Sequence, residues 1–335
     1  MTWTEEGLAR TWRALRDIEE SSWAISGLYQ DGNVSFHAGR SFPEGLEAVV
    51  VDFPAGTIRT SDSLPSGGGF DVVSLPSESW IADREALALV RHVEGAHELF
   101  SMMSVNVLRQ LEQLDMSKPR LVLDAFFVRV REWQDFMANK RRKPLSEERQ
   151  VGLQGELLVL DMLADKVQSP LLALNFWQGP LMAPQDFYVE AGAIEVKSTA
   201  RANGFLAKIN SVEQLDAERW PMYLCGLTFA EDDSGESLQQ VIVRLMQKMQ
   251  SSGLGKQFEA LLLMSGYLAE HADRYDRKLS CSDSKYFLVS EAFPCLRRGS
   301  LPGPIRRASY DLDMDAIGEK AVSSTEMFLS LLGEI

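Results

Sequence analysis

The chain of 335 residues is 45% hydrophobic and carries 34 Lys and Arg against 48 Asp and Glu, which gives a formal net charge of −14. This length and composition allow a large core and two domains, whereas the acidity excludes a protein that coats nucleic acid through a uniformly basic surface, because Lys and Arg supply non-specific duplex affinity. Three widely spaced cysteines and four histidines support neither a disulfide framework nor a zinc site, and the lack of a run of about eighteen apolar residues excludes a membrane-spanning helix.

The first part of the chain, residues 1–115, has the pattern of a β-rich domain. Its N-terminus is acidic and amphipathic, where a secretory signal would be basic and then apolar, so we expect a cytoplasmic protein with no membrane partner. A helical pattern precedes strand-like runs separated by turns; these segments are residues 7–20 for the helix and residues 23–29, 34–37, 47–52 and 70–74 for the strands. We expect this domain to bind DNA or a partner protein.

Helical spacing of apolar residues dominates from residue 83 to residue 138, and we expect residues 116–145 to form a helical connector. The connector ends in a run of four basic residues, Lys140, Arg141, Arg142 and Lys143. Such runs are often solvated loops, but this one leads into a helix that carries a candidate site residue, so we predict that it contacts nucleic acid. Arg201 and Lys208 are predicted to extend the same basic patch.

A helix predicted over residues 147–165 opens the third segment, residues 146–335. Ser146 is a suitable N-cap, and acidic residues follow it in the first turn, as helix starts prefer. The helix is apolar nearly all the way round, so most of it should be buried. Glu156 lies in this helix beside Gly155. Because a carboxylate buried alone is costly, Glu156 either meets a cation or lies on a narrow solvent-facing strip.

A short hairpin at residues 186–197 carries the strongest chemical signal. Asp186 opens an apolar strand, a glycine-containing turn follows, and the return strand presents Glu195 and Lys197. Side chains alternate along a strand, so Glu195 and Lys197 share one face. The turn can bring Asp186 towards Glu195 across the hairpin, so that two acidic side chains converge on one ion.

This arrangement suits a hard divalent cation such as Mg²⁺, with Mn²⁺ as a substitute, because such ions take oxygen ligands and keep several waters. We predict that Asp186 and Glu195 are metal ligands, that the main-chain carbonyl of Val196 adds a ligand, and that Glu156 supports a second ion or a water. Lys197 would orient or help to deprotonate an attacking water. The alternative is a surface ion pair of Glu195 and Lys197, worth less than roughly 1 kcal/mol.

The spacing of an acid two residues before a lysine is not specific on its own, because it occurs twice more in the chain. Residues 276–278 lie in a charged stretch that is typical of a solvated segment. Residues 283–285 precede an apolar, strand-like run instead of lying within one, which makes them the weaker alternative. The hairpin is favoured by the additional acid at Asp186 and by the helix that precedes it.

The hairpin and its surroundings resemble the PD-(D/E)XK nuclease superfamily, in which Asp and Glu lie on adjacent strands and Lys follows Glu by two residues. The resemblance implies an α/β (α+β) fold with a restriction-endonuclease-like core, made of a helix, a mixed central sheet and a second helix. Residues 152–158 resemble the first core helix, residues 210–215 the start of the second, and residues 221–229 the next strand. Gln154 and Gln214, in the two helical stretches, are expected to support the catalytic side chains.

Most of the chain is also similar to the bacterial PD-(D/E)XK motif proteins of phage-defence and restriction-like gene clusters. The sequence departs from the pattern at one place, because Gln185 instead of proline precedes the aspartate. The resemblance implies a Mg²⁺-dependent DNA endonuclease of the restriction or phage-defence type, with the catalytic residues Asp186, Glu195, Lys197 and Glu156.

The alternative function is a catalytically inactive interaction subunit of a defence complex that keeps the nuclease fold as a scaffold. The net acidity and the missing Pro-Asp pair favour it. The partners we expect are DNA and proteins of a defence or restriction complex, which would supply much of the grip on DNA. A homodimer is a further expectation, because cutting both strands of a duplex most simply needs two active sites.

Overall fold

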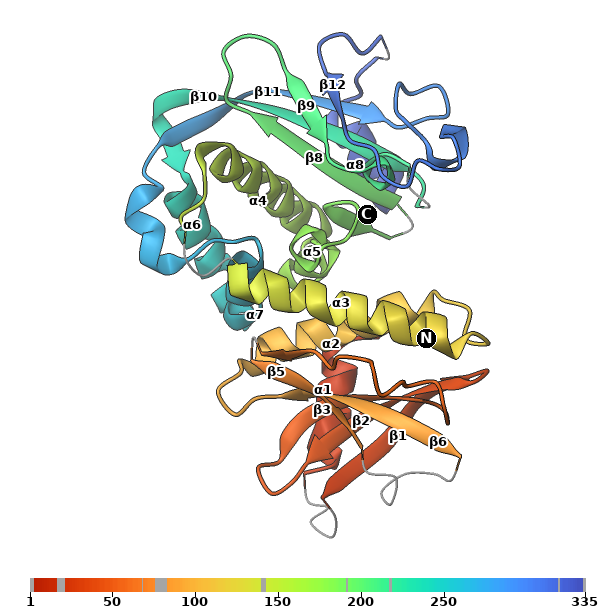
Figure 1. The fold of residues 1–335 in the computed structure, drawn as a ribbon. Helices are drawn as coiled ribbons and strands as arrows, with labels where there is room; N and C mark the ends of the chain where they lie inside the picture. Colours follow the sequence, from red (N-terminus) through yellow and green to blue (C-terminus); the bar gives the residue numbers. More distant parts are fainter. Residues whose placement is uncertain are drawn as a thin grey trace. The chain divides into compact units, whose positions relative to one another are not determined.

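The computed structural model describes residues 3–16, 22–67, 69–75, 83–139, 143–190, 192–216, 219–318 and 320–333. The chain forms two units, residues 1–142 and residues 143–335, each with its own helices and strands (Figure 1). This mixture of helices and sheets confirms the expected α+β class. In the described residues, no helix combines the length and the apolar character that crossing a bilayer requires.

The first unit is built on an antiparallel six-stranded sheet (Figure 1). From one edge to the other, the strands are β1 (Trp23–Asp31), β2 (Val34–Ser41), β3 (Leu46–Pro54), β6 (Arg84–Arg91), β5 (Phe70–Ser74) and β4 (Ser66–Gly67). The central strand β3 is buried along most of its length on both faces. Helix α1 (Glu5–Ala14) packs against this sheet, and the indole nitrogen of Trp12 donates a hydrogen bond to the carbonyl of Ala48 at 2.8 Å.

The prediction of helical spacing from residue 83 onwards is wrong for its first segment, because residues 84–91 form the strand β6. Its apolar run is short and buried on both faces, and periodicity alone does not distinguish such a run from a buried helix. Sheet hydrogen bonding decides the outcome, because β6 fills the place between β3 and β5. Helices α2 (His97–Glu112) and α3 (Pro119–Asn139) follow and pack on each other. Helix α3 occupies most of the expected connector and belongs to the first unit.

The second unit contains a mixed four-stranded sheet with the strand order β11-β10-β8-β7. Strand β8 runs parallel to β10 and antiparallel to β7, while β10 and β11 are antiparallel. Two further strands form a separate antiparallel pair: β9, which follows β8 in the sequence, and β12 from the C-terminal region. These strands are β7 (Phe187–Val189), β8 (Gly192–Thr199), β9 (Leu206–Ile209), β10 (Met222–Ser237), β11 (Lys278–Leu288) and β12 (Tyr310–Asp313).

Helix α4 (Glu147–Val167) is the expected first core helix and lies against the sheet (Figure 1). The side chain of Ser146 caps it by accepting a hydrogen bond from the N–H of Arg149. The helix packs on β8, and Gly155 permits the close approach, because a Cβ at this position would lie 1.9 Å from Ser198 Oγ. The contact brings the next residue, Glu156, to the level of the sheet.

The second core helix expected from residues 210–215 does not form there. Those residues end in a 3₁₀ turn, η3 (Val212–Gln214). Val212 and Leu215 are fully buried, and their three-residue spacing suits a 3₁₀ turn, in which side chains three apart are eclipsed. Residues 215–221 are all that separate η3 from β10, which leaves little chain for a helix. A longer helix, α6 (Leu238–Ser251), follows β10 instead and packs beside α4.

The other helical elements complete the second unit. Helix α5 lies between α4 and the hairpin in sequence and contacts both α4 and β7, while α7 packs on α6. Their bounds are α5 (Pro170–Phe176), η2 (Gly179–Leu181), α7 (Gly255–Met264), η4 (Ala269–Arg274), η5 (Arg298–Ser300) and α8 (Ser324–Leu332).

Candidate functional site

The β7–β8 hairpin positions the first acidic pair. Phe187 pairs with Ile194 in the antiparallel register, so Asp186, one residue earlier, lies across from Glu195. The Asp186 side chain is anchored there, because its Oδ2 accepts a hydrogen bond from the main-chain N–H of Val196 at 2.8 Å. The hairpin therefore brings together two carboxylates from opposite sides of one turn.

Glu195 is held on one side by an ammonium and an amide. Its Oε1 lies 2.7 Å from Lys197 Nζ and accepts a hydrogen bond from Gln214 Nε2 at 2.7 Å. The amide oxygen of Gln214 accepts from the main-chain N–H of Asn210 at 2.7 Å and from Lys197 Nζ at 3.4 Å. Because the Asn210 N–H is a donor, the amide oxygen must face it, and the amide nitrogen then faces Glu195. Gln214 thus bridges Glu195 and Lys197, although it comes from a 3₁₀ turn and not from the expected helix.

The second oxygen of Glu195 has a different environment. Its Oε2 is buried and has no hydrogen-bond partner among the described residues. The residue is 1% exposed, so bulk water cannot solvate this oxygen. Burying a charged oxygen without a partner is costly, and a bound cation would remove that cost.

Glu156 reaches the same region from helix α4. Its Oε2 accepts a hydrogen bond from the indole nitrogen of Trp177 at 2.8 Å. Gly179 lies between this carboxylate and that of Asp186: a Cβ on Gly179 would be 3.2 Å from Glu156 Oε2 and 2.8 Å from Asp186 Oδ1. The missing side chain therefore leaves open the space that both carboxylates flank.

Electrostatics reflect this crowding of acids. Burial raises the pKa of Glu195 well above its usual range, and the negative charges of Asp186 and Glu156 add to the increase while Lys197 opposes it. Burial also raises the pKa of Asp186, against the charge of Lys197 and the Val196 N–H. Burial alone would lower the pKa of Lys197, but the surrounding carboxylates outweigh it and raise that pKa. Three carboxyl groups thus share the site with one ammonium, so that full ionisation would leave an excess of negative charge.

The residues present fit a hard divalent cation. In the described part of the chain, no three His, Cys, Asp or Glu side chains are arranged to hold a metal ion by themselves. Mg²⁺ does not need three, because it is usually held by one or two carboxylates while waters and a substrate phosphate complete its shell. The unpartnered oxygen of Glu195, the neighbouring carboxylate of Asp186 and the space beside Gly179 meet this requirement.

The other predicted site residues are placed as follows. Gln154 is buried on α4, and its amide nitrogen donates to the main-chain carbonyl of Glu236 at 2.9 Å instead of to a site carboxylate. Gln185, which replaces the proline of the family pattern, is also buried and donates to the carbonyl of Glu213 at 2.6 Å. Gln185 therefore ties the hairpin to η3, the turn that carries Gln214.

The predicted basic patch is described only in part. Lys140, Arg141 and Arg142 lie outside the described residues, while Lys143 is exposed. Arg201 is exposed and lies 3.5 Å from Glu148 at the start of α4. Lys208 is exposed on β9, where it pairs in register with Asp311 of β12. Contact of these residues with nucleic acid stays a prediction.

The two other acid-x-Lys patterns have different partners. In the first, Lys278 Nζ donates to the carbonyl of Asp233 at 3.0 Å. In the second, Lys285 lies 2.7 Å from Asp315, an acid outside its own pattern. Both lysines of β11 therefore have partners outside their own acid-x-Lys pattern.

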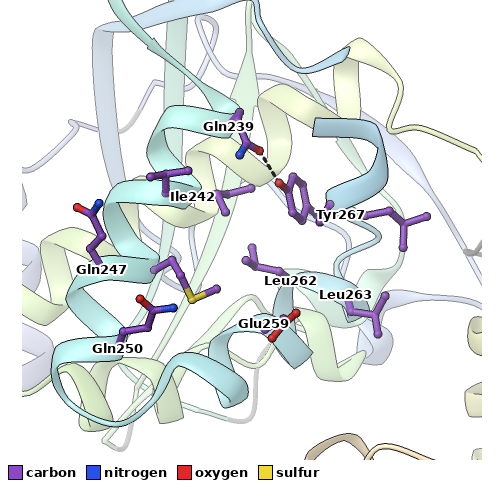
Figure 2. Close-up of a pocket in the computed structure, with 12 residues that line it drawn as sticks. Gln239, Ile242, Gln247, Gln250, Glu259, Leu262, Leu263 and Tyr267 are labelled. Atoms are coloured by element: carbon purple, nitrogen blue, oxygen red, sulfur yellow. Dashed lines mark hydrogen bonds between the residues drawn. The ribbon is translucent and has the colours of Figure 1, made fainter. Parts of the chain in front are cut away.

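A cavity of about 440 Å³ lies between helices α6 and α7 (Figure 2). Apolar side chains such as Ile242, Leu262 and Leu263 form much of its wall, and the hydroxyl of Tyr267 donates to the Gln239 side chain. None of the hairpin residues lines it. The cavity is therefore separate from the group of carboxylates at the hairpin.

Trp177 and Gly179 are the site residues that the sequence analysis missed. The chain reverses direction after Trp177 and returns beside it, so that Trp177 forms an antiparallel β-bridge with Phe187 of the hairpin. Nothing in the sequence marks this bridge. The glycine immediately before Pro180 is a signal for a turn, but it does not indicate which side chains the turn approaches.

Comparison with known proteins identifies a family for the chain. The model of the family described as "Putative PD-(D/E)XK family member, (DUF4420)" matches residues 8–315, which include Asp186, Glu195 and Lys197. No curated protein and no solved structure matches the chain. The family model covers most of both units, and the resemblance inferred from the hairpin is confirmed. The chain therefore belongs to the PD-(D/E)XK family DUF4420.

Proposed function

We propose that this protein is a divalent-metal-dependent DNA endonuclease of the restriction or phage-defence type. Membership of a PD-(D/E)XK family suggests a nuclease-type function, and the hairpin supports the finer proposal. The observation that carries it is the buried, unpartnered Oε2 of Glu195, in a group of carboxylates that also includes Asp186 and Glu156. A fold kept only as a scaffold gains nothing from that uncompensated oxygen.

In this proposal Asp186 and Glu195 hold Mg²⁺ or Mn²⁺, with Glu156 and the carbonyl of Val196 as further ligands or supports. When bound, the cation supplies Lewis-acid polarisation of a phosphodiester oxygen. The Lys197 ammonium, held 2.7 Å from Glu195 Oε1, donates hydrogen bonds that orient the attacking water and offset phosphate charge.

Metal titration combined with a cleavage assay tests the function. Wild type should bind Mn²⁺ and Mg²⁺ by calorimetry and nick plasmid DNA, while the double variant Asp186→Ala/Glu195→Ala should do neither. Lys197→Ala should abolish nicking and leave the circular dichroism spectrum unchanged. Asp276→Ala is the matched control, because this exposed acid belongs to another acid-x-Lys pattern. Unchanged nicking by the Asp186 or Lys197 variants would refute the assignment.

The second candidate is the inactive interaction subunit, which the substitution of Gln185 for proline favours. Absence of metal binding by wild type would support this candidate. The titration must be repeated with added DNA, because DNA can complete the coordination shell of the metal. In either case the net charge of −14 leads us to propose that a partner protein supplies part of the grip on DNA. A homodimer with two active sites would cut both strands of a duplex.

A further inference from the structure

Trp177 stands at the end of α5 and is completely buried. Its main chain forms a β-bridge with Phe187 at the start of β7, and its N–H donates to the carbonyl of Leu174. Its ring packs on Phe258 of α7, with the ring centres 6.3 Å apart. These contacts fix the direction of the indole N–H, which donates to Glu156 Oε2 at 2.8 Å.

The residues that follow Trp177 hold the neighbouring carboxylate. The main-chain N–H groups of Gln178 and Gly179 both donate to the carbonyl of Asp186, at 2.7 and 2.9 Å. One short segment, residues 177–179, therefore fixes Glu156 through a side chain and Asp186 through its main chain. The space left open at Gly179 lies between these two carboxylates.

The chemistry of the donor is informative. An indole N–H is uncharged and can only donate, so it orients a carboxylate without neutralising it. Glu47, a buried acid of the first unit, is held differently: its two oxygens lie 3.0 Å from Arg40 and 2.7 Å from Arg91. A guanidinium donor would compete with a bound cation, whereas the indole of Trp177 adds no positive charge beside Glu156.

We propose that Trp177 is a positioning residue: its indole N–H occupies one oxygen of Glu156 and holds that carboxylate beside Asp186 for a divalent cation. The proposal rests on the proposed function, because it assumes that the carboxylates bind metal. It adds a residue that touches neither the cation nor the substrate. Partners of metal ligands in this outer position typically change metal affinity by about 10- to 100-fold when they are removed.

The first experiment is calorimetric titration of Mn²⁺ into Trp177→Phe, which keeps an aromatic ring and removes the N–H. We expect the affinity for Mn²⁺ to fall about tenfold. Trp12→Phe is the matched control, because Trp12 is equally buried and also loses a 2.8 Å indole hydrogen bond, to Ala48 in the first unit. Its affinity for Mn²⁺ should equal that of wild type.

A double-mutant cycle separates positioning from a general effect on packing. In a Glu156→Gln background, Trp177→Phe should cause little further loss of Mn²⁺ affinity, because the carboxylate that Trp177 orients is gone. An equal loss in both backgrounds, or a Trp177→Phe affinity as high as that of Trp12→Phe, would overturn the proposal.

A measurement on wild type keeps the test valid if Trp177→Phe does not fold. The indole N–H signal of Trp177 in an NMR spectrum should shift when Mg²⁺ is added, whereas that of Trp12 should stay in place. A Trp177 signal that does not respond to saturating Mg²⁺ overturns the positioning role. Absence of Mn²⁺ binding by wild type, both with and without added DNA, overturns the proposed function together with it. Binding that Asp186→Ala abolishes and Trp177→Phe leaves unchanged overturns the role of Trp177 alone.

Discussion

Glu47 in the first unit and Glu195 in the second are both glutamates on β-strands, 6% and 1% exposed. Both oxygens of Glu47 are paired, one with Arg40 at 3.0 Å and the other with Arg91 at 2.7 Å. In Glu195 one oxygen is shared by an ammonium and an amide, and the other has no hydrogen-bond partner in the described part of the chain. The two side chains are therefore similarly buried, but both oxygens of Glu47 face a positive charge whereas only one oxygen of Glu195 does.

The pKa values of the two acids move in opposite directions for this reason. Burial would raise the pKa of Glu47, but hydrogen bonding to Arg91 and the charges of Arg91 and Arg40 outweigh it and lower that pKa. Burial raises the pKa of Glu195, and neighbouring acids raise it further. A buried carboxylate with paired charges stabilises the fold, whereas one in a group of acids is suited to a ligand that the protein chain does not supply.

The largest effect is expected from Glu47→Gln. The change leaves the buried Arg40 and the part-buried Arg91 without this counter-charge, and breaking a buried ion pair in this way typically costs about 3–5 kcal/mol. We expect denaturant unfolding to show a loss of this size. Glu44→Gln, at an exposed position of the same unit, should change stability by less than about 0.5 kcal/mol. A loss below about 1 kcal/mol in Glu47→Gln would show that its pairing is not what stabilises the first unit.

The pH dependence of the first unit is the next largest effect. Burial and the charge of Arg84 lower the pKa of His37 to about 4. These two effects outweigh the negative charge of Asp52, whose Oδ2 lies 2.7 Å from His37 Nε2. The imidazole is then neutral at pH 7 and donates its Nε2 hydrogen to Asp52. The unfolded chain takes up the proton near pH 6.5, so stability is lost as the pH falls from about 6.5 towards 4, by roughly 3 kcal/mol at pH 4.

NMR titration of His37 measures this pKa directly. His37→Gln removes the titrating group while keeping a donor near Asp52, so its unfolding free energy should fall less than that of wild type between pH 7 and pH 4. A His37 signal that titrates near pH 6.5 in the folded protein would contradict the expected burial effect.

Glu195→Gln tests the other side of the comparison. The raised pKa of Glu195 means that folding favours its neutral form, so the ionised form lowers stability at neutral pH. A neutral amide should leave the unfolding free energy equal to or above that of wild type, while Mn²⁺ affinity falls by at least about 100-fold, or about 2.7 kcal/mol. Unfolding and calorimetry on the same preparation check both. A destabilisation as large as that of Glu47→Gln would show that Glu195 is a structural acid too.

The sequence allowed part of this comparison to be predicted. The hairpin positions of Asp186, Glu195 and Lys197 follow from the alternation of side chains along a strand, which is a local property. The α+β class and the first core helix were also predictable, because capping and apolar patterns are local. The turn that presents Gln214 was not, since residues 210–215 fit a helix start as well as a 3₁₀ turn. The choice depends on burial against β9 and β12.

The contacts that surround the acids depend on the folded chain as a whole. Trp177 meets Glu156 only because the chain after α5 returns to bridge Phe187. Likewise, the charge partners of Glu47 come from β2 and β6, and the apolar pattern of β6 also fits a buried helix. The acids of the second unit are therefore predictable from the sequence, whereas the charged partners of each buried acid depend on the tertiary fold.

The smallest effect is expected from Gly179→Ala, which fills the space between the carboxylates of Asp186 and Glu156. The backbone of Gly179 is not in the left-handed region, so the methyl group acts through its position, 2.8 Å from Asp186 Oδ1 and 3.2 Å from Glu156 Oε2. We expect calorimetry to show an affinity for Mn²⁺ about tenfold lower, or about 1.4 kcal/mol. Gly152→Ala on α4, where a Cβ meets nothing within 4 Å, should leave the affinity unchanged and stabilise the helix by about 0.5–1 kcal/mol. Wild-type affinity in Gly179→Ala would mean that the cation does not use the space between Asp186 and Glu156, and the difference between the two units would then rest on Glu195 alone.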